Sequence, residues 1–75
     1  MSDGICVLAW RDPGATMINR GDRLHFCKDV QLMASDLNRE YPEVDHWAAP
    51  ATDYEIAAHP IRAANLVRLF ADEMN

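Results

Sequence analysis

Five residues of this sequence have side chains of the kinds that bind metals or act in catalysis, namely Cys6, His25, Cys27, His46 and His59. His25 and Cys27 are two residues apart, so in a strand both would lie on the same face. Structural zinc sites usually contain two ligands close in sequence, as C-x2-C or H-x3-H, and neither spacing occurs here. We therefore expect no metal site and no cofactor, and we expect both cysteines to pack as small apolar side chains.

Cys27 is the strongest candidate for a catalytic group, because it lies just before a predicted helix, whose N-terminus lowers the pKa of a thiol. With a histidine as its base it would make a small cysteine-dependent enzyme, which we keep as an alternative. The chain contains no glycine-rich phosphate loop, G-x-S-x-G or H-E-x-x-H motif. A chain of this size also offers little pocket volume. We therefore expect a protein that is not an enzyme.

Length and composition indicate one domain, residues 1–75, with 49% hydrophobic residues and two cysteines. A chain this short buries only roughly 60 to 65% of its unfolded surface, so tight packing or a homodimer must compensate for the absence of a disulfide framework. The N-terminus has no basic segment, and Trp10-Arg11 interrupts its apolar run. This pattern is typical neither of a signal peptide nor of a membrane span, so we expect a cytoplasmic protein with reduced thiols.

The net charge of -5 is unevenly distributed along the chain. Residues 1–28 carry four basic and three acidic residues, a net charge of +1, whereas residues 29–75 carry nine acidic and three basic residues, a net charge of -6. Phosphate contacts dominate the affinity of proteins for nucleic acids, so this balance disfavours direct nucleic-acid binding. Neither nucleic acid nor a membrane is an expected partner.

The elements that position these residues centre on residues 16–41, which read as a hairpin followed by a helix. The runs Thr16 to Asn19 and Arg23 to Cys27 favour strands, and Gly21 between them can adopt positive φ in the turn. Strand 5–11 is apolar on both faces, which indicates a central strand. With the turn Asp12-Pro13-Gly14, these segments predict a three-stranded antiparallel meander, and 44–48 is a possible fourth strand.

Apolar residues at helical spacing follow the hairpin, from Val30 through Met33, Ala34 and Leu37 to Tyr41. Asp29 is the predicted N-cap of this helix. Pro42 ends it at Tyr41, because a residue before proline avoids the α region.

Thr52-Asp53-Tyr54-Glu55 has the form of a capping box, which starts a helix. Pro60 lies too deep for the first turn of that helix. We therefore predict a helix over 53–58 and another over 60–73, or one kinked helix, with a strand over 54–58 as the alternative. The fold class is α+β, a small antiparallel sheet with two or three helices on one face.

The function that these features favour is a small acidic, non-catalytic protein-binding module that modulates or inhibits a larger, basic-surfaced protein. Carboxylates would meet a basic groove, and exposed apolar side chains would anchor the contact. In size, acidity and absence of motifs the chain resembles inhibitor proteins of bacteriophages and mobile elements, including some anti-CRISPR proteins. The predicted partner-binding residues are Leu32, Asp36, Glu40, Glu43, Asp45 and Trp47.

The alternative from another class is a self-associating structural protein. In the last helix Ala63, Leu66, Val67, Phe70 and Met74 share one face. A homodimer would then form through Phe70, Leu66 and Met74.

Overall fold

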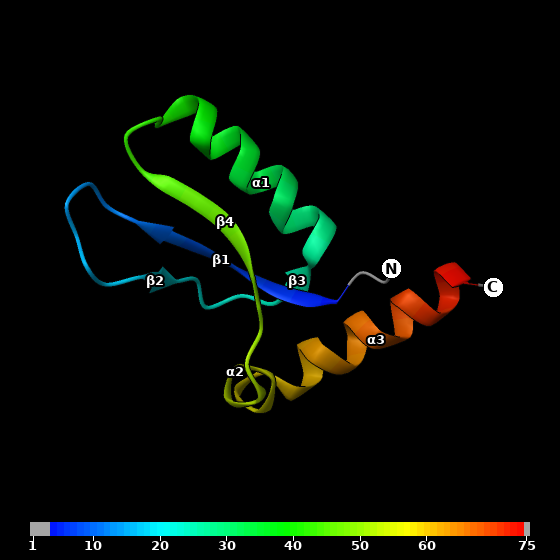
Figure 1. The fold of residues 1–75 in the computed structure, drawn as a ribbon. Coiled ribbons are helices and arrows are strands. Elements are labelled where there is room, and N and C mark those ends of the chain that lie inside the picture. The colour runs from blue at the N-terminus through cyan, green and yellow to red at the C-terminus, as the bar shows by residue number, and fades with distance from the viewer. Residues whose placement is uncertain (1–3, 75) are drawn as a thin grey trace.

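The computed structural model describes residues 4–74, which form a four-stranded antiparallel sheet and three helices (Figure 1). The elements in chain order are β1 (Ile5–Arg11), β2 (Asn19–Arg20), β3 (His25–Phe26), α1 (Cys27–Glu40), β4 (Asp45–Pro50), α2 (Asp53–Ala58) and α3 (Pro60–Met74). The predicted α+β class is confirmed, with the fourth strand present. Among the described residues no helix is long and apolar enough to cross a membrane.

The central strand β1 pairs with β4 on one edge and with both β2 and β3 on the other. Its bounds and its central position are as predicted, because residues that are apolar on both faces must be covered on both sides. β4 pairs with β1 over six positions, from Cys6 opposite Pro50 to Arg11 opposite Asp45. The fourth strand therefore runs two residues further than the predicted 44–48.

The predicted hairpin over residues 16–27 is wrong. β2 and β3 do not pair with each other but follow the same edge of β1, Ala9 opposite Arg20 and Ile5 opposite Phe26. Gly21 lies between them and donates its backbone N–H to the Leu8 carbonyl at 2.7 Å. Residues 19–26 therefore run along one edge of β1, and they do not fold back on themselves as the predicted hairpin required.

Gly21 is explained by close approach and not by its freedom at positive φ. Among the described residues only Gly14, in the turn after β1, has a positive φ, at 75°. A Cβ atom on Gly21 would lie 3.4 Å from the carbonyl oxygen of Leu8, at the short limit of ordinary contact. Glycine therefore lets this irregular segment reach the backbone of β1.

The helices cover both faces of the sheet, and the prediction that they lie on one face is wrong (Figure 1). Cys6 on β1 is joined to Cys27 at the start of α1, whereas Val7 and Ala9 cluster with Ala63 of α3. Successive residues of a strand point to opposite faces. α1 therefore covers one face and α3 the other.

The prediction for α1 is correct for its buried side chains and wrong for its first residue. Val30 and Ala34 are buried against the sheet, and Pro42 follows the C-cap Tyr41, as expected. The helix begins at Cys27, with Phe26 as its N-cap, so the predicted N-cap Asp29 is wrong and lies in the first turn. A carboxylate there still favours the helix, since it faces the positive end of the helix dipole.

A disulfide joins Cys6 to Cys27, whose Cα atoms are 4.8 Å apart. The expectation of reduced, unlinked cysteines is therefore wrong for this structure. Cys6 is buried on β1. Cys27 is the first residue of α1, and its backbone N–H donates to the Gly4 carbonyl at 3.0 Å. The pairing needed the two chain segments to meet, which their separation of 21 residues does not reveal.

The predicted capping box and both predicted helices after it are confirmed. The Glu55 N–H donates to the Thr52 hydroxyl at 3.1 Å, and the Thr52 N–H donates to the Glu55 carboxylate at 2.9 Å. α2 ends before Pro60, which opens α3, so the alternative strand over 54–58 is excluded. The first two turns of α3 pack on the sheet through Ala63 and Leu66, and the rest of the helix extends beyond it (Figure 1).

Candidate functional site

Four of the six predicted partner-binding residues lie on α1 or in the connection that follows it. Leu32, Asp36 and Glu40 follow each other at intervals of four residues, so they form one stripe on the helix, and all three are exposed. Glu43 is exposed in the connection to β4. We call Leu32, Asp36, Glu40 and Glu43 the acidic surface. Arg39 forms an ion pair with Asp36 within it, which leaves Glu40 and Glu43 as its less compensated charges.

Asp45 and Trp47 do not belong to the acidic surface. They pair with Arg11 and Ala9 on β1, so the register places them on the sheet face opposite α1. Trp47 packs there against the buried core cluster. The structure therefore brings four of the six predicted residues together and separates two.

The acidic surface is held in place by Asn38, on the adjoining side of α1. Its side-chain amide donates to the His46 carbonyl at 2.9 Å and accepts from the His46 N–H at 2.8 Å. These two bonds attach the end of α1 to β4. His46, one of the candidate catalytic histidines, is thereby engaged in joining two elements.

Cys27 is in the disulfide, so it offers no thiolate in this structure. The cysteine-dependent alternative thus lacks its nucleophile in the oxidised state. Within residues 4–74 no group of three or more metal-binding side chains converges.

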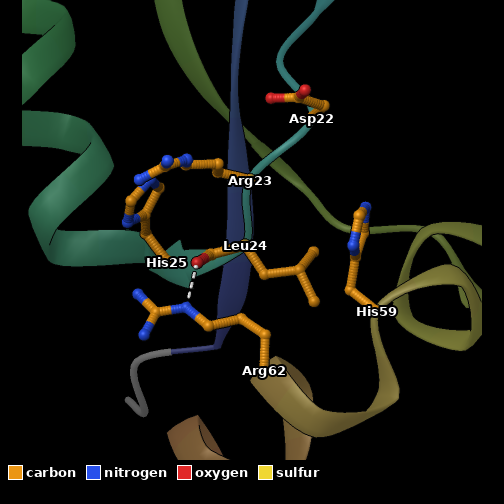
Figure 2. A pocket seen from close by; sticks show the side chains of 6 residues that line it. All are labelled: Asp22, Arg23, Leu24, His25, His59 and Arg62. Carbon is orange, nitrogen blue, oxygen red and sulfur yellow. Dashed lines mark hydrogen bonds between the residues drawn. The ribbon is translucent and has the colours of Figure 1, made fainter.

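A second candidate site, which the sequence did not suggest, lies at the opposite end of α1 (Figure 2). It is a cavity of about 460 Å³ lined by Asp22, Arg23, Leu24, His25, His59 and Arg62. We call it the basic pocket. Its residues come from the segment between β2 and β3, from the first residue of β3, from the junction of α2 and α3, and from the first turn of α3.

Three nitrogen-bearing side chains of the basic pocket point in one direction, those of Arg23, His25 and Arg62 (Figure 2). Arg62 is held there because its Nε–H donates to the Leu24 carbonyl at 2.9 Å. Burial and the charges of Arg62 and Arg23 lower the pKa of His25, and Asp29 opposes this shift. Both guanidinium groups lie on the same side of Leu24 as the His25 imidazole (Figure 2).

The two sites lie toward opposite ends of α1 and carry opposite charge. The basic pocket adjoins its start, through His25 two residues before Cys27, and the acidic surface occupies its later turns. A helix of 14 residues spans about 20 Å at 1.5 Å per residue. At ordinary ionic strength this distance exceeds the Debye length of about 10 Å, so the two sites can act independently.

Arg20, on β2, makes structural contacts and does not belong to the basic pocket. Its Nε–H and an Nη–H donate to the two oxygens of Glu55, both at 2.8 Å, and Nη2 also donates to the Pro50 carbonyl at 2.9 Å. The ion pair and the bond from Thr52 lower the pKa of Glu55 to about 2. Arg20 therefore joins β2 to α2 and is not available to a ligand.

The sequence offers only a partial signal for the basic pocket. Arg23 and His25 alternate within a predicted strand, which places them on one side of it, and Arg62 falls in the first turn of a predicted helix. These segments are 37 residues apart, and only the packing of α3 under the sheet brings them together.

No family model, curated protein or solved structure matches this chain.

Proposed function

We propose that this chain is a non-catalytic protein-binding module that modulates or inhibits a larger partner, and that it docks through the acidic surface onto a basic protein groove. The observation that carries the proposal is that Leu32, whose surface is 66% accessible, shares one stripe of α1 with the exposed Asp36 and Glu40, and the exposed Glu43 follows in the next connection. Charge of one sign attracts a complementary surface and speeds the encounter. An exposed leucine within it supplies apolar area that becomes buried on binding.

The self-association alternative has less support from the packing of α3. Leu66, one of its three predicted contacts, is only 2% exposed because it is buried within the chain's own core. A side chain already buried in one chain contributes little further area to a dimer. Phe70, another predicted contact, is half-buried and remains partly accessible, and the side chain of Met74 lies outside the described residues.

The cytoplasmic location remains a prediction, and the disulfide offers a way to test it. Disulfides persist in oxidising compartments and are rare where glutathione keeps thiols reduced. Trapping of free thiols in intact cells reports the state of Cys6 and Cys27. Alkylation of both would support the cytoplasm, and protection of both would support an oxidising compartment.

The docking proposal is tested by neutralising the acidic surface without changing its shape. The tagged chain, the variant Glu40→Gln/Glu43→Gln and the matched control Asp53→Asn/Asp72→Asn are used to capture proteins from lysate of the native host at low and high salt. Both variants change the net charge by the same amount, but the control acids lie on α2 and α3. Partners that are retained by the wild type are then purified and their dissociation constants measured.

We expect one basic partner that binds the wild type and the control alike. The Glu40→Gln/Glu43→Gln variant should bind it about tenfold more weakly, since two peripheral charges contribute roughly 1.4 kcal/mol together. Binding should also weaken with salt. A partner held equally by all three proteins, or none captured at either salt, contradicts the proposal.

A further inference from the structure

The basic pocket concentrates positive charge in a chain that is acidic overall. Arg23, His25 and Arg62 gather at one cavity, while the whole chain carries a net charge of -5. In the part of the chain that the structure describes, neither Arg23 nor Arg62 forms an ion pair with a carboxylate. Asp22 also lines the cavity, but it lies apart from these three side chains (Figure 2). Converging like charges repel each other, and a bound anion relieves this repulsion.

The Arg62 side chain is already oriented to bind an oxyanion. Its Nε–H is already bonded to the Leu24 carbonyl at 2.9 Å, which fixes the direction of the guanidinium group. Its Nη groups remain for a ligand, and a planar guanidinium donates two parallel bonds to a phosphate or carboxylate. Because the side chain is oriented beforehand, less conformational entropy is lost on binding.

The volume of the pocket favours a small organic molecule as its ligand over an isolated ion. Sites for small organic ligands measure roughly 300 to 1,000 Å³, and this cavity measures about 460 Å³. His59 lies on the other side of Leu24 from Arg23, His25 and Arg62 (Figure 2), so an imidazole ring is available to the uncharged part of the ligand. A long polyanion is disfavoured, since its remaining charges would meet the acidic remainder of the chain.

We propose that the basic pocket binds a small phosphorylated molecule, with the phosphate group held by Arg23, His25 and Arg62 and the organic part directed toward His59. This site is independent of the acidic surface and of the function proposed for it. The protein would then bind a phosphate monoester at one end of α1 and a protein partner at the other.

The proposal is tested with phenyl phosphate as a phosphate monoester and with inorganic phosphate as the free ion, each titrated at low salt and followed by NMR of the backbone amides. We expect saturable shifts around residues 22–25 and 59–62, with phenyl phosphate binding more tightly than inorganic phosphate. Equal affinity would overturn the assignment to an ester. Absence of saturable shifts with both would overturn the site.

Three variants separate this site from general electrostatic attraction. Arg23→Gln and Arg62→Gln should each weaken phenyl phosphate binding by about tenfold, the effect of one charge-assisted hydrogen bond. Arg68→Gln changes the same charge on α3, outside the pocket, and should bind as the wild type does. Arg62→Gln also loses the hydrogen bond to the Leu24 carbonyl and could unfold for that reason. Arg23 is exposed, so Arg23→Gln tests the site even if Arg62→Gln does not fold. Equal weakening by Arg68→Gln would overturn the proposal.

The protonation of His25 provides a second readout. Its pKa is lowered by burial, Arg62 and Arg23 and is opposed by Asp29, so the free pocket holds it neutral at pH 7. A bound anion raises that pKa, because it favours the imidazolium form. Binding therefore takes up a proton, and affinity rises as pH falls.

This pH dependence is measured with phenyl sulfate, since the second pKa of a phosphate ester, about 6, would obscure it. Affinity should rise between about pH 7 and 5 in the wild type, and His25→Asn should remove the rise. His59→Asn, which replaces the other histidine of the pocket, should retain it. A rise that persists in His25→Asn and disappears in His59→Asn contradicts the role of His25.

Discussion

At the scale of single residues, Glu55 has two structural roles. It completes the capping box of α2, and it forms a two-bond ion pair with Arg20 from a segment 35 residues away. The sequence reveals the cap, because its partner Thr52 is three residues away. It does not reveal the ion pair, since nothing local connects Arg20 to α2.

The pKa of Glu55, lowered from 4.5 to about 2, predicts a stability that depends on pH. A group whose pKa is lower in the folded state stabilises the protein above its unfolded pKa and loses this contribution as pH falls through the folded pKa. Glu55→Gln keeps the cap acceptor but removes the charge. It should lower the free energy of unfolding at pH 7 by about 1 kcal/mol, since the pair is partly solvated.

Chemical denaturation of both proteins across pH measures this effect. The difference between them should narrow as pH falls from 4.5 toward 2. A constant difference between wild type and Glu55→Gln over that range would contradict the role of the ion pair.

At the scale of elements, α3 buries only part of its predicted apolar stripe. Leu66 is 2% exposed and Val67, its neighbour, is 60% exposed. The apolar stripe predicted for this helix continues past the edge of the sheet, so the periodicity identifies the helix but not how much of it is covered.

Substitutions at these two neighbours should therefore differ strongly in their effect on the free energy of unfolding. Leu66→Ala should lower the free energy of unfolding by about 2 to 5 kcal/mol through the loss of buried area and the cavity left behind. Val67→Asp should change it by less than about 0.5 kcal/mol. Thermal denaturation measures both. A strongly destabilised Val67→Asp, with a smaller mass by light scattering than the wild type, would instead show that a second copy covers α3.

At the scale of the whole molecule, the Cys6–Cys27 disulfide supplies stability that a small core lacks. A chain of 75 residues has a total stability of roughly 4 to 11 kcal/mol at typical values per residue. Linking positions 21 residues apart restricts the unfolded chain and contributes roughly 3 kcal/mol in the chain-entropy model. The disulfide is therefore a large part of what keeps the sheet and α1 together.

Reduction of the protein should lower its unfolding midpoint accordingly. Denaturation of the wild type with and without reductant measures the loss, which we expect to be about 3 kcal/mol. The double variant Cys6→Ala/Cys27→Ala should be as unstable as the reduced protein and insensitive to reductant. An unchanged midpoint of the wild type on reduction would contradict the contribution of the disulfide.

The sequence by itself determined the elements whose causes are local. Strand 5–11 follows from apolar residues on both faces, the start of α2 from Thr52 and Glu55, and the ends of α1 and α2 from Pro42 and Pro60. Each of these signals acts within a few residues, so no knowledge of the fold is needed to interpret it. The acidic turns of α1 were predicted for the same reason, because helical spacing alone places their side chains on one stripe.

Only the tertiary structure decided what meets across the chain. The segment between β1 and α1 follows β1 because the central strand needs a neighbour on that edge, and Gly21 permits the approach. The same packing joins Cys6 to Cys27 and brings Arg62 to Arg23 and His25. These contacts depend on which surfaces are buried together, and a pattern of neighbouring residues does not specify that.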